Sequence, residues 1–88
     1  MKVLILYRAH SEHGTAVESY VRDYSKQHPD APIQLLDVDT VEGAAKAELY
    51  DVMQYPAVLA LQEGGQEAQR WVGDHLPLMQ EVAYYAIT

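Results

Sequence analysis

The chain has 88 residues, 49% of them hydrophobic, which is enough apolar side chain for one folded core and too much for a disordered segment. Its 13 acidic and 6 basic residues give a formal net charge of −7, and such a surface repels nucleic-acid phosphates and anionic membranes. The absence of cysteine excludes disulfides, thiolate metal ligands and thiol redox chemistry. The sequence has no signal-peptide pattern and no apolar run of transmembrane length. We therefore expect one cytoplasmic domain over residues 1–88, without nucleic-acid or membrane partners.

The first third of the chain shows a strand pattern and then a helix pattern. Residues 2–7 are a short apolar run rich in branched side chains, which is typical of a strand buried on both faces. From Thr15 the apolar residues repeat at helical spacing, and these residues are Val17, Tyr20, Val21 and Tyr24. Prolines within residues 27–32 end this helix, and residues 33–39 read as the second strand.

Residues 39–54 are predicted to form the second helix. Its apolar stripe consists of Val41, Ala44, Ala45, Leu49, Val52 and Met53. Asp39 or Thr40 can cap its first turn, whereas Gly43 weakens that turn by roughly 1 kcal/mol relative to alanine. Pro56 stops the helix.

The last third predicts a hairpin and a helix. Residues 57–61 and 67–72 are strand patterns joined by a turn at 63–66, and Pro77 lies near the start of a final helix. The apolar face of that helix is predicted to be Leu78, Met79, Val82 and Ala86. The order β-α-β-α-β-β-α indicates an α/β fold with a mixed four-stranded sheet and helices on both faces.

Three stretches of this pattern together resemble the thioredoxin-like superfamily, over nearly the whole chain. LILYRAHSEHG (4–14) is similar to the strand, turn and helix start where family members place Cys-x-x-Cys. MQYPAVLAL (53–61) is similar to the loop that holds a cis-proline before the third strand, so the resemblance implies a cis bond before Pro56. EGGQEAQRWVGD (63–74) is similar to the final hairpin and the glycine after it.

The chemistry of the family does not carry over. Aligned from Tyr7, the four motif positions fall on Ser11, Glu12, His13 and Gly14. In the family, the first cysteine is a nucleophilic thiolate at the helix N-terminus and the second resolves a mixed disulfide. A serine hydroxyl and a glycine cannot replace them, so we expect a redox-inactive domain with no catalytic residue and no cofactor.

The frame around the changed motif nevertheless predicts a binding surface. In this fold, the turn at 10–14, the loop at 54–56 and the segment at 73–75 form a shallow groove, and redox-active relatives use it to hold an extended substrate strand. The candidate binding residues are His10, Ser11, Glu12, His13, Gly14, Tyr55, Pro56, Gly73 and Asp74. The leading hypothesis is therefore a protein or peptide partner bound in this groove.

Glutathione or another small thiol is the alternative ligand. Glutathione transferases share the fold, and in some classes a serine at this position donates a hydrogen bond to the glutathione thiolate. Ser11 would take that role, and Asp74 would meet the ligand's α-amino group. The cations available for its carboxylates are reduced to Arg8 or Arg70. The simpler interpretation makes Ser11 the N-cap of the first helix, or assigns the cap to a Thr15-x-x-Glu18 capping box.

A divalent-metal site is a third hypothesis. His10 and His13 are spaced to lie on one helix face, with Glu12 close by, but no third ligand stands at a recognisable spacing. Solvated histidines in an exposed turn are the simpler interpretation. A scaffold with no active surface also remains open.

The aromatic residues have less specific predictions. Tyr55 can raise the cis content of the bond before Pro56 and form a wall of the groove, or simply pack against neighbouring rings. Trp71 is predicted to be partly buried on the sheet. Tyr84 and Tyr85 are predicted to pack the last helix, with one of the two rings left exposed.

Overall fold

The computed structural model describes residues 1–73 and 75–87, so the predicted groove residue Asp74 lies outside the described residues. The predicted order β-α-β-α-β-β-α is confirmed. The elements are β1 (Lys2–Tyr7), α1 (Gly14–Gln27), β2 (Ile33–Asp37), α2 (Val41–Leu49), β3 (Ala57–Leu61), β4 (Glu67–Val72) and α3 (Met79–Ile87). None of the helices in these ranges is long and apolar enough to cross a membrane.

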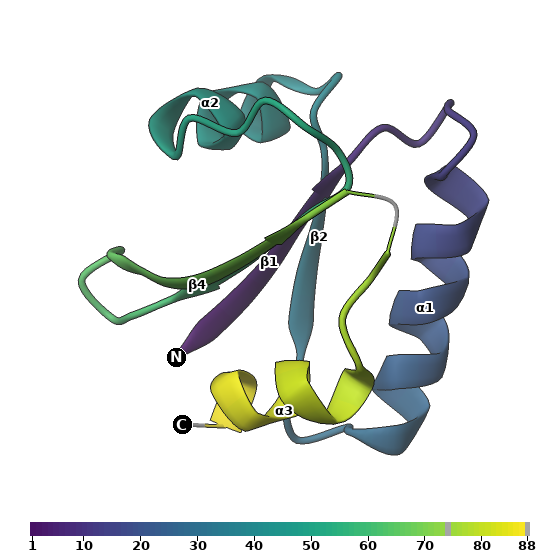
Figure 1. Ribbon diagram of the computed structural model, residues 1–88, viewed down its shortest axis with the longest axis vertical. Coiled ribbons are helices and arrows are strands. Elements are labelled where there is room, and N and C mark those ends of the chain that lie inside the picture. Colours follow the sequence, from purple (N-terminus) through teal and green to yellow (C-terminus); the bar gives the residue numbers. More distant parts are fainter. Residues whose placement is uncertain (74, 88) are drawn as a thin grey trace.

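The sheet brings the predicted groove segments to one of its ends. Its strand order is β2-β1-β3-β4, with β1 and β2 parallel and the other two pairs antiparallel. Leu6 pairs with Ala57, and Ala57 pairs with Val72. The chain therefore leaves β1 and β4, and enters β3, at the same end of the sheet. We call this end, where Tyr7, Ala57 and Val72 lie, the site end of the sheet (Figure 1).

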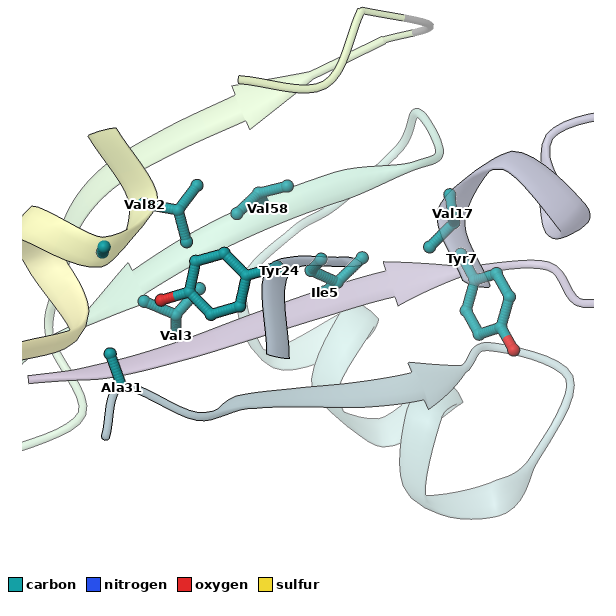
Figure 2. Close-up of a cluster of buried hydrophobic side chains, with 9 residues drawn as sticks. Val3, Ile5, Tyr7, Val17, Tyr24, Ala31, Val58 and Val82 are labelled. Carbon is teal, nitrogen blue, oxygen red and sulfur yellow. The ribbon is translucent and has the colours of Figure 1, made fainter. Parts of the chain in front are cut away.

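Helices cover both faces of the sheet, as predicted (Figure 1). Successive side chains of a strand point to opposite faces, so the fully apolar β1 feeds two cores. α1 and α3 cover one core, which contains Val3, Ile5, Tyr7, Val17, Tyr24, Ala31, Val58, Val82 and Ala83 (Figure 2). α2 covers the other, which contains Leu4, Leu6, Val38, Ala47, Val52, Ala57, Leu59 and Leu61.

The predicted stripe of α1 is confirmed. Val17 and Tyr24 are fully buried, and Tyr20 and Val21 pack as partly buried residues against the same core. Tyr20 also donates its phenolic hydrogen to the carbonyl of Pro77 at 2.7 Å, which fastens α1 to the segment before α3.

The predicted stripe of α2 is wrong except for Val52, which is buried in the core under the helix. Val41, Leu49 and Met53 are 90%, 69% and 81% exposed, and the helix instead buries Gly43 and Ala47. A Cβ at Gly43 would lie 2.0 Å from the Asp37 carbonyl oxygen. Gly43 therefore lets the helix backbone pack directly on the end of β2, which is a tighter approach than any apolar stripe permits.

α2 also ends earlier than predicted, although Thr40 caps its start as expected by accepting the Gly43 N–H at 3.1 Å. The helix closes in a Schellman motif: Asp51 takes a left-handed conformation (φ 54°) and the Val52 N–H donates to the Ala47 carbonyl at 2.8 Å. The helix therefore stops at Leu49 rather than continuing to residue 54.

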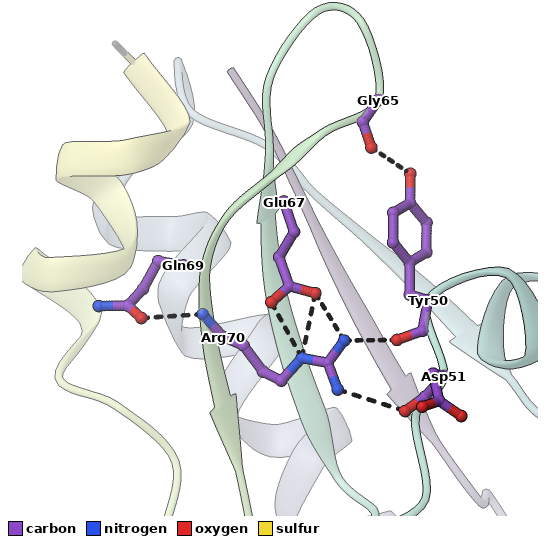
Figure 3. Close-up of polar contacts among 6 residues, drawn as sticks. All are labelled: Tyr50, Asp51, Gly65, Glu67, Gln69 and Arg70. Carbon is purple, nitrogen blue, oxygen red and sulfur yellow. Dashed lines mark hydrogen bonds and ion pairs between the residues drawn. The ribbon is translucent and has the colours of Figure 1, made fainter.

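A contact from β4 reinforces this ending. The Arg70 guanidinium donates to the carbonyls of Tyr50 and Asp51, and Glu67 holds the guanidinium through an ion pair of 2.6 Å (Figure 3). Hydrogen bonding to Glu67 raises the pKa of Arg70. The carbonyls of the C-cap residue Tyr50 and of Asp51, just beyond the helix, thus have a cationic partner contributed by a distant strand.

Two further predictions need correction. β2 ends at Asp37 rather than residue 39, because the chain turns there and the Thr40 N–H donates to the Asp37 carbonyl at 3.0 Å. Leu78 is 62% exposed and does not belong to the apolar face of α3. α3 begins one residue later, and Leu76 packs against the core instead.

Candidate functional site

The turn that replaces the cysteine motif is closed by its own side chains. The Arg8 N–H donates to Nε2 of His13 at 3.1 Å, and the Ser11 hydroxyl donates to the Arg8 carbonyl at 2.6 Å. Both backbone polar groups of Arg8 are therefore paired within the turn. His13, not Ser11 or a Thr15 capping box, is the N-cap of α1, and it makes no side-chain cap hydrogen bond. Both capping predictions are wrong, because the Ser11 hydroxyl bonds back to Arg8 and Thr15 already lies inside the helix, which begins at Gly14.

Gly14 has a steric role at this position. A Cβ there would lie 2.2 Å from the Ala9 carbonyl oxygen, and the backbone cannot yield to it cheaply. The Gly14 N–H also donates to the Ser11 carbonyl at 3.2 Å. The turn therefore packs onto the first residue of α1 so closely that only glycine fits.

The histidine pair gains no support as a metal site. Nε2 of His13 already accepts the Arg8 N–H, so it can bind a metal only by breaking the turn. His10 and Glu12 are exposed. Among residues 1–73 and 75–87, no group of three or more histidine and acidic side chains is placed to hold a metal ion.

Tyr7 anchors the base of this turn to α1. Its side chain is 6% exposed and donates to Oε2 of Glu18 at 2.7 Å. Burial, together with the Glu18 carboxylate, raises the pKa of Tyr7 from 10.0 to about 12. The phenol therefore keeps its proton, and with it this hydrogen bond, well into the alkaline range.

The loop before β3 contains backbone groups without a hydrogen-bond partner among the described residues, unlike the backbone of Arg8 in the turn. The Tyr55–Pro56 bond is cis, and the Pro56 carbonyl accepts the Gly73 N–H at 3.1 Å. Within residues 1–73 and 75–87, the N–H and C=O of Tyr55 have no hydrogen-bond partner. Gly73 has a φ of +107°, and a Cβ placed on it would meet no atom within 4 Å. The loop side of the site end is therefore unpaired and open.

Arg8 connects the two sides. Its Nη1 lies 2.6 Å from Oδ1 of Asp39, and its guanidinium lies over the Tyr55 ring, 5.3 Å from the ring centroid. The Tyr55 hydroxyl in turn donates to the Val52 carbonyl at 3.2 Å. The phenol ring is thus held in place between the end of β1 and the end of α2.

Two adjoining pockets open on the loop side. One, of about 380 Å³, includes Arg8 and Tyr55 in its lining, and the other, of about 210 Å³, includes Arg70 and Val72. Asp51 and Met53 line both, and we call the pair the Met53 pockets. The Met53 side chain is 81% exposed and Val72 is 45% exposed. Sequence reasoning missed this surface because Met53 fitted a helical stripe, and the clue was its position just before the Tyr55–Pro56 loop.

Solved structures of thioredoxins have an architecture similar to that of this chain. Thioredoxin from Plasmodium falciparum matches with a TM-score of 0.74 and 16% identity, over 96% of this chain and 79% of that one. Thioredoxin 1 from Thermosipho africanus matches with a TM-score of 0.67 and 20% identity, over 97% and 89% of the two chains. Mitochondrial thioredoxin 3 from Saccharomyces cerevisiae matches with a TM-score of 0.69 and 18% identity, over 97% and 74%.

The chain has a thioredoxin-like fold. At these identities the similarity establishes the fold alone. No protein-family model matches the sequence, and a search of curated proteins gave no match.

In this thioredoxin-like fold, three of the residues predicted to bind glutathione already have partners, while Asp74 lies outside the described residues. The Ser11 hydroxyl hydrogen is donated to the Arg8 carbonyl, so it is not available to a thiolate. Arg8 is paired with Asp39, and Arg70 with Glu67 and the end of α2. The glutathione hypothesis therefore gains no support from the geometry.

Proposed function

We propose that this thioredoxin-like domain is redox-inactive and binds an extended segment of a partner protein along the loop side of the site end. The observation that carries the proposal is the unpaired N–H and C=O of Tyr55 among the described residues, beside exposed apolar side chains. An extended peptide satisfies such a donor and acceptor with its own backbone, as in strand addition to a sheet edge.

Side-chain recognition is assigned to the Met53 pockets. An exposed methionine adapts its shape to different apolar partners, and a cluster of exposed apolar side chains is typical of an interaction surface. Met53 and Val72 are the large apolar side chains that line these pockets and are exposed, 81% and 45% respectively. A partner segment with an apolar side chain at this point would bury both.

Charge favours a basic residue next to that apolar side chain. The chain carries a net charge of −7, and Asp51 lines both Met53 pockets. The two arginines there are already paired with Asp39 and Glu67. Neither ion pair involves Asp51, so the charge left at the Met53 pockets is acidic, and an acidic peptide is disfavoured.

Because the chain has no cysteine, we expect it to bind its partner without exchanging a disulfide with it. Thiol exchange needs a thiolate, and this chain has none. The partner would therefore be held and released unchanged.

The test is selection of peptides from a displayed random library, followed by NMR titration of the best peptide into the labelled protein. We expect the Tyr55 and Gly73 amide resonances to shift most. Met53→Asp should weaken binding at least about tenfold, because it places a charge where an apolar side chain docks. The matched control is Val41→Asp, since Val41 is also exposed (90%) but lies on α2 and does not line the Met53 pockets.

Ser11→Ala separates this proposal from glutathione binding. Peptide binding should be unchanged in this variant, whereas a thiol ligand held by the serine would lose affinity. Peptides that bind equally well to Met53→Asp and wild type, and shift only residues remote from Tyr55, would refute the proposal.

A further inference from the structure

A second concave site lies away from the site end, between β4 and α3. This pocket of about 390 Å³ falls in the range of small-molecule sites, roughly 300–1,000 Å³. Its lining residues are Gln69, Trp71, Gln80, Glu81, Tyr84 and Tyr85. We call it the aromatic pocket. None of these residues lines the Met53 pockets, so its role is independent of the function proposed above.

Two sequence spacings bring these side chains together: the two-residue repeat of strand β4 and the three- and four-residue spacing of helix α3. Gln69 and Trp71 are two residues apart on β4 and so point to the same face, the face covered by α3. Figure 3 shows Gln69 on the α3 side of β4, whereas Arg70 points the other way toward Tyr50. On α3, Glu81 precedes Tyr84 and Tyr85 by three and four residues, the spacing that aligns side chains on one face.

The three rings that line the pocket contact one another edge to face rather than in a flat stack. Trp71 and Tyr85 have centroids 5.5 Å apart at an interplanar angle of 74°, and Tyr84 and Tyr85 are 5.3 Å apart at 89°. Trp71 and Tyr85 are held from behind, because both pack against the core under α1 and α3. Tyr84 is 64% exposed, so its ring is accessible to a ligand from solvent.

The charge in the pocket has one sign. Glu81 is the only formally charged residue among the described residues that line it, and it is an exposed carboxylate. The chain as a whole carries a net charge of −7. Ring faces are also the negative part of an aromatic side chain. Aromatic walls and a carboxylate therefore both attract a cation, and both repel an anion.

We propose that the aromatic pocket binds a small organic cation with a methylated ammonium group. Trp71, Tyr84 and Tyr85 supply the aromatic walls, and Glu81 supplies the counter-charge. A methylated ammonium fits better than a bare one, because its methyl groups contact the rings and it gives up less hydration on entering the pocket. A metal ion does not fit, since the pocket offers one carboxylate and two amides.

The experiment uses Trp71, the only tryptophan in the chain, as the reporter. Choline is titrated at constant ionic strength while Trp71 emission and the ring resonances of Tyr84 and Tyr85 are followed. The matched control ligand is 3,3-dimethyl-1-butanol, which has the shape of choline without the charge. Choline should bind about three- to tenfold more tightly than this neutral analogue, as cation–π contacts of moderate strength predict.

Variants assign the contacts without disturbing the core, because Tyr84 and Glu81 are exposed. Tyr84→Leu and Glu81→Gln should each weaken choline binding about threefold or more, whereas Tyr84→Phe keeps the ring and should retain it. Glu48→Gln removes the same charge from α2, which covers the opposite face of the sheet, and should leave binding unchanged.

Three results would overturn the proposal. The first is equal binding of choline and its neutral analogue. The second is no change in emission or ring resonances with choline at about 100 mM, weaker than any useful site. The third is binding of a trimethyl-lysine peptide but not of choline, which would show that the occupant is a protein side chain rather than a small molecule.

Discussion

The turn after β1 and the loop before β3 lie at the same end of the sheet, but they treat their backbone polar groups differently. In the turn, His13 and Ser11 pair with the N–H and C=O of Arg8. In the loop, the N–H and C=O of Tyr55 have no partner within the described residues. The side chains of the turn therefore satisfy its backbone, whereas the loop offers an unpaired donor and acceptor.

This difference separates two properties that a redox-active thioredoxin combines. A reactive turn must keep its side chains free for chemistry, whereas a binding loop needs only accessible backbone and apolar surface. Here the side chains of the turn are bonded to its own backbone, and the binding proposed above is assigned to the loop. The predictions below test whether the two regions are in fact separable.

The largest expected effect is from Gly14→Ala. The new Cβ would lie 2.2 Å from the Ala9 carbonyl oxygen, so the turn must shift, at a cost of about 1–3 kcal/mol of unfolding free energy. Urea unfolding measures it. The control is Gly64→Ala, where a Cβ meets nothing within 4 Å, and its effect should stay within about 0.5 kcal/mol. Equal stabilities of the two variants would show that the turn is not tightly packed.

A smaller effect is expected from His13→Ala. The variant removes the acceptor of the Arg8 N–H, and loss of one such hydrogen bond costs about 1 kcal/mol. His10→Ala, in the same turn but exposed, should cost less than about 0.5 kcal/mol. Peptide binding at Tyr55 should survive both changes. If His13→Ala abolished binding without lowering stability, the turn would have to be counted as part of the binding surface.

The smallest effect concerns how the free energy of unfolding changes with pH in the alkaline range. The pKa of Tyr7 is raised from 10.0 to about 12, so above pH 10 the unfolded chain loses a proton that the folded chain keeps. The folded state is therefore destabilised as pH rises from about 10 to about 12. In Tyr7→Phe this slope should fall by up to about one proton, measured by urea unfolding between about pH 9 and 12.

Tyr20 provides the comparison for that experiment, because burial raises its pKa to about 12 as well. Tyr20→Phe should reduce the slope to a similar extent, although Tyr20 bonds to Pro77 rather than to Glu18. An unchanged slope in Tyr7→Phe would mean that Tyr7 ionises equally easily in the folded and unfolded chains.

Most of the fold could be predicted because its strands and its first helix have strong local patterns. β1 and β3 are continuous apolar runs, and α1 repeats its apolar residues at helical spacing, so propensity, pattern and burial agree there. α2 was mispredicted because its contact with the sheet is made by Gly43 and Ala47. Two small residues give no hydrophobic period, whereas the exposed Val41, Leu49 and Met53 imitate one.

The candidate site was predicted in position but not in organisation. The motif alignment placed the turn and the Tyr55–Pro56 loop at one end of the sheet, and strand pairing bears this out. It gave no sign that Ser11 would bond back to the Arg8 carbonyl, because a serine near a helix start can equally cap the helix. Met53 was assigned to a helix that ends before reaching it.

The sequence by itself determined the order of the elements, the doubly buried central strands and the absence of thiol chemistry, since each follows from residue type and local spacing. Only the tertiary structure decided where α2 ends and which side chains remain at the surface. Arg70 donates to the carbonyl of Tyr50, the C-cap residue of α2, although Arg70 lies on a strand and is 20 residues further along the chain. No local pattern encodes such a contact, because it exists only once the sheet has brought the two segments together.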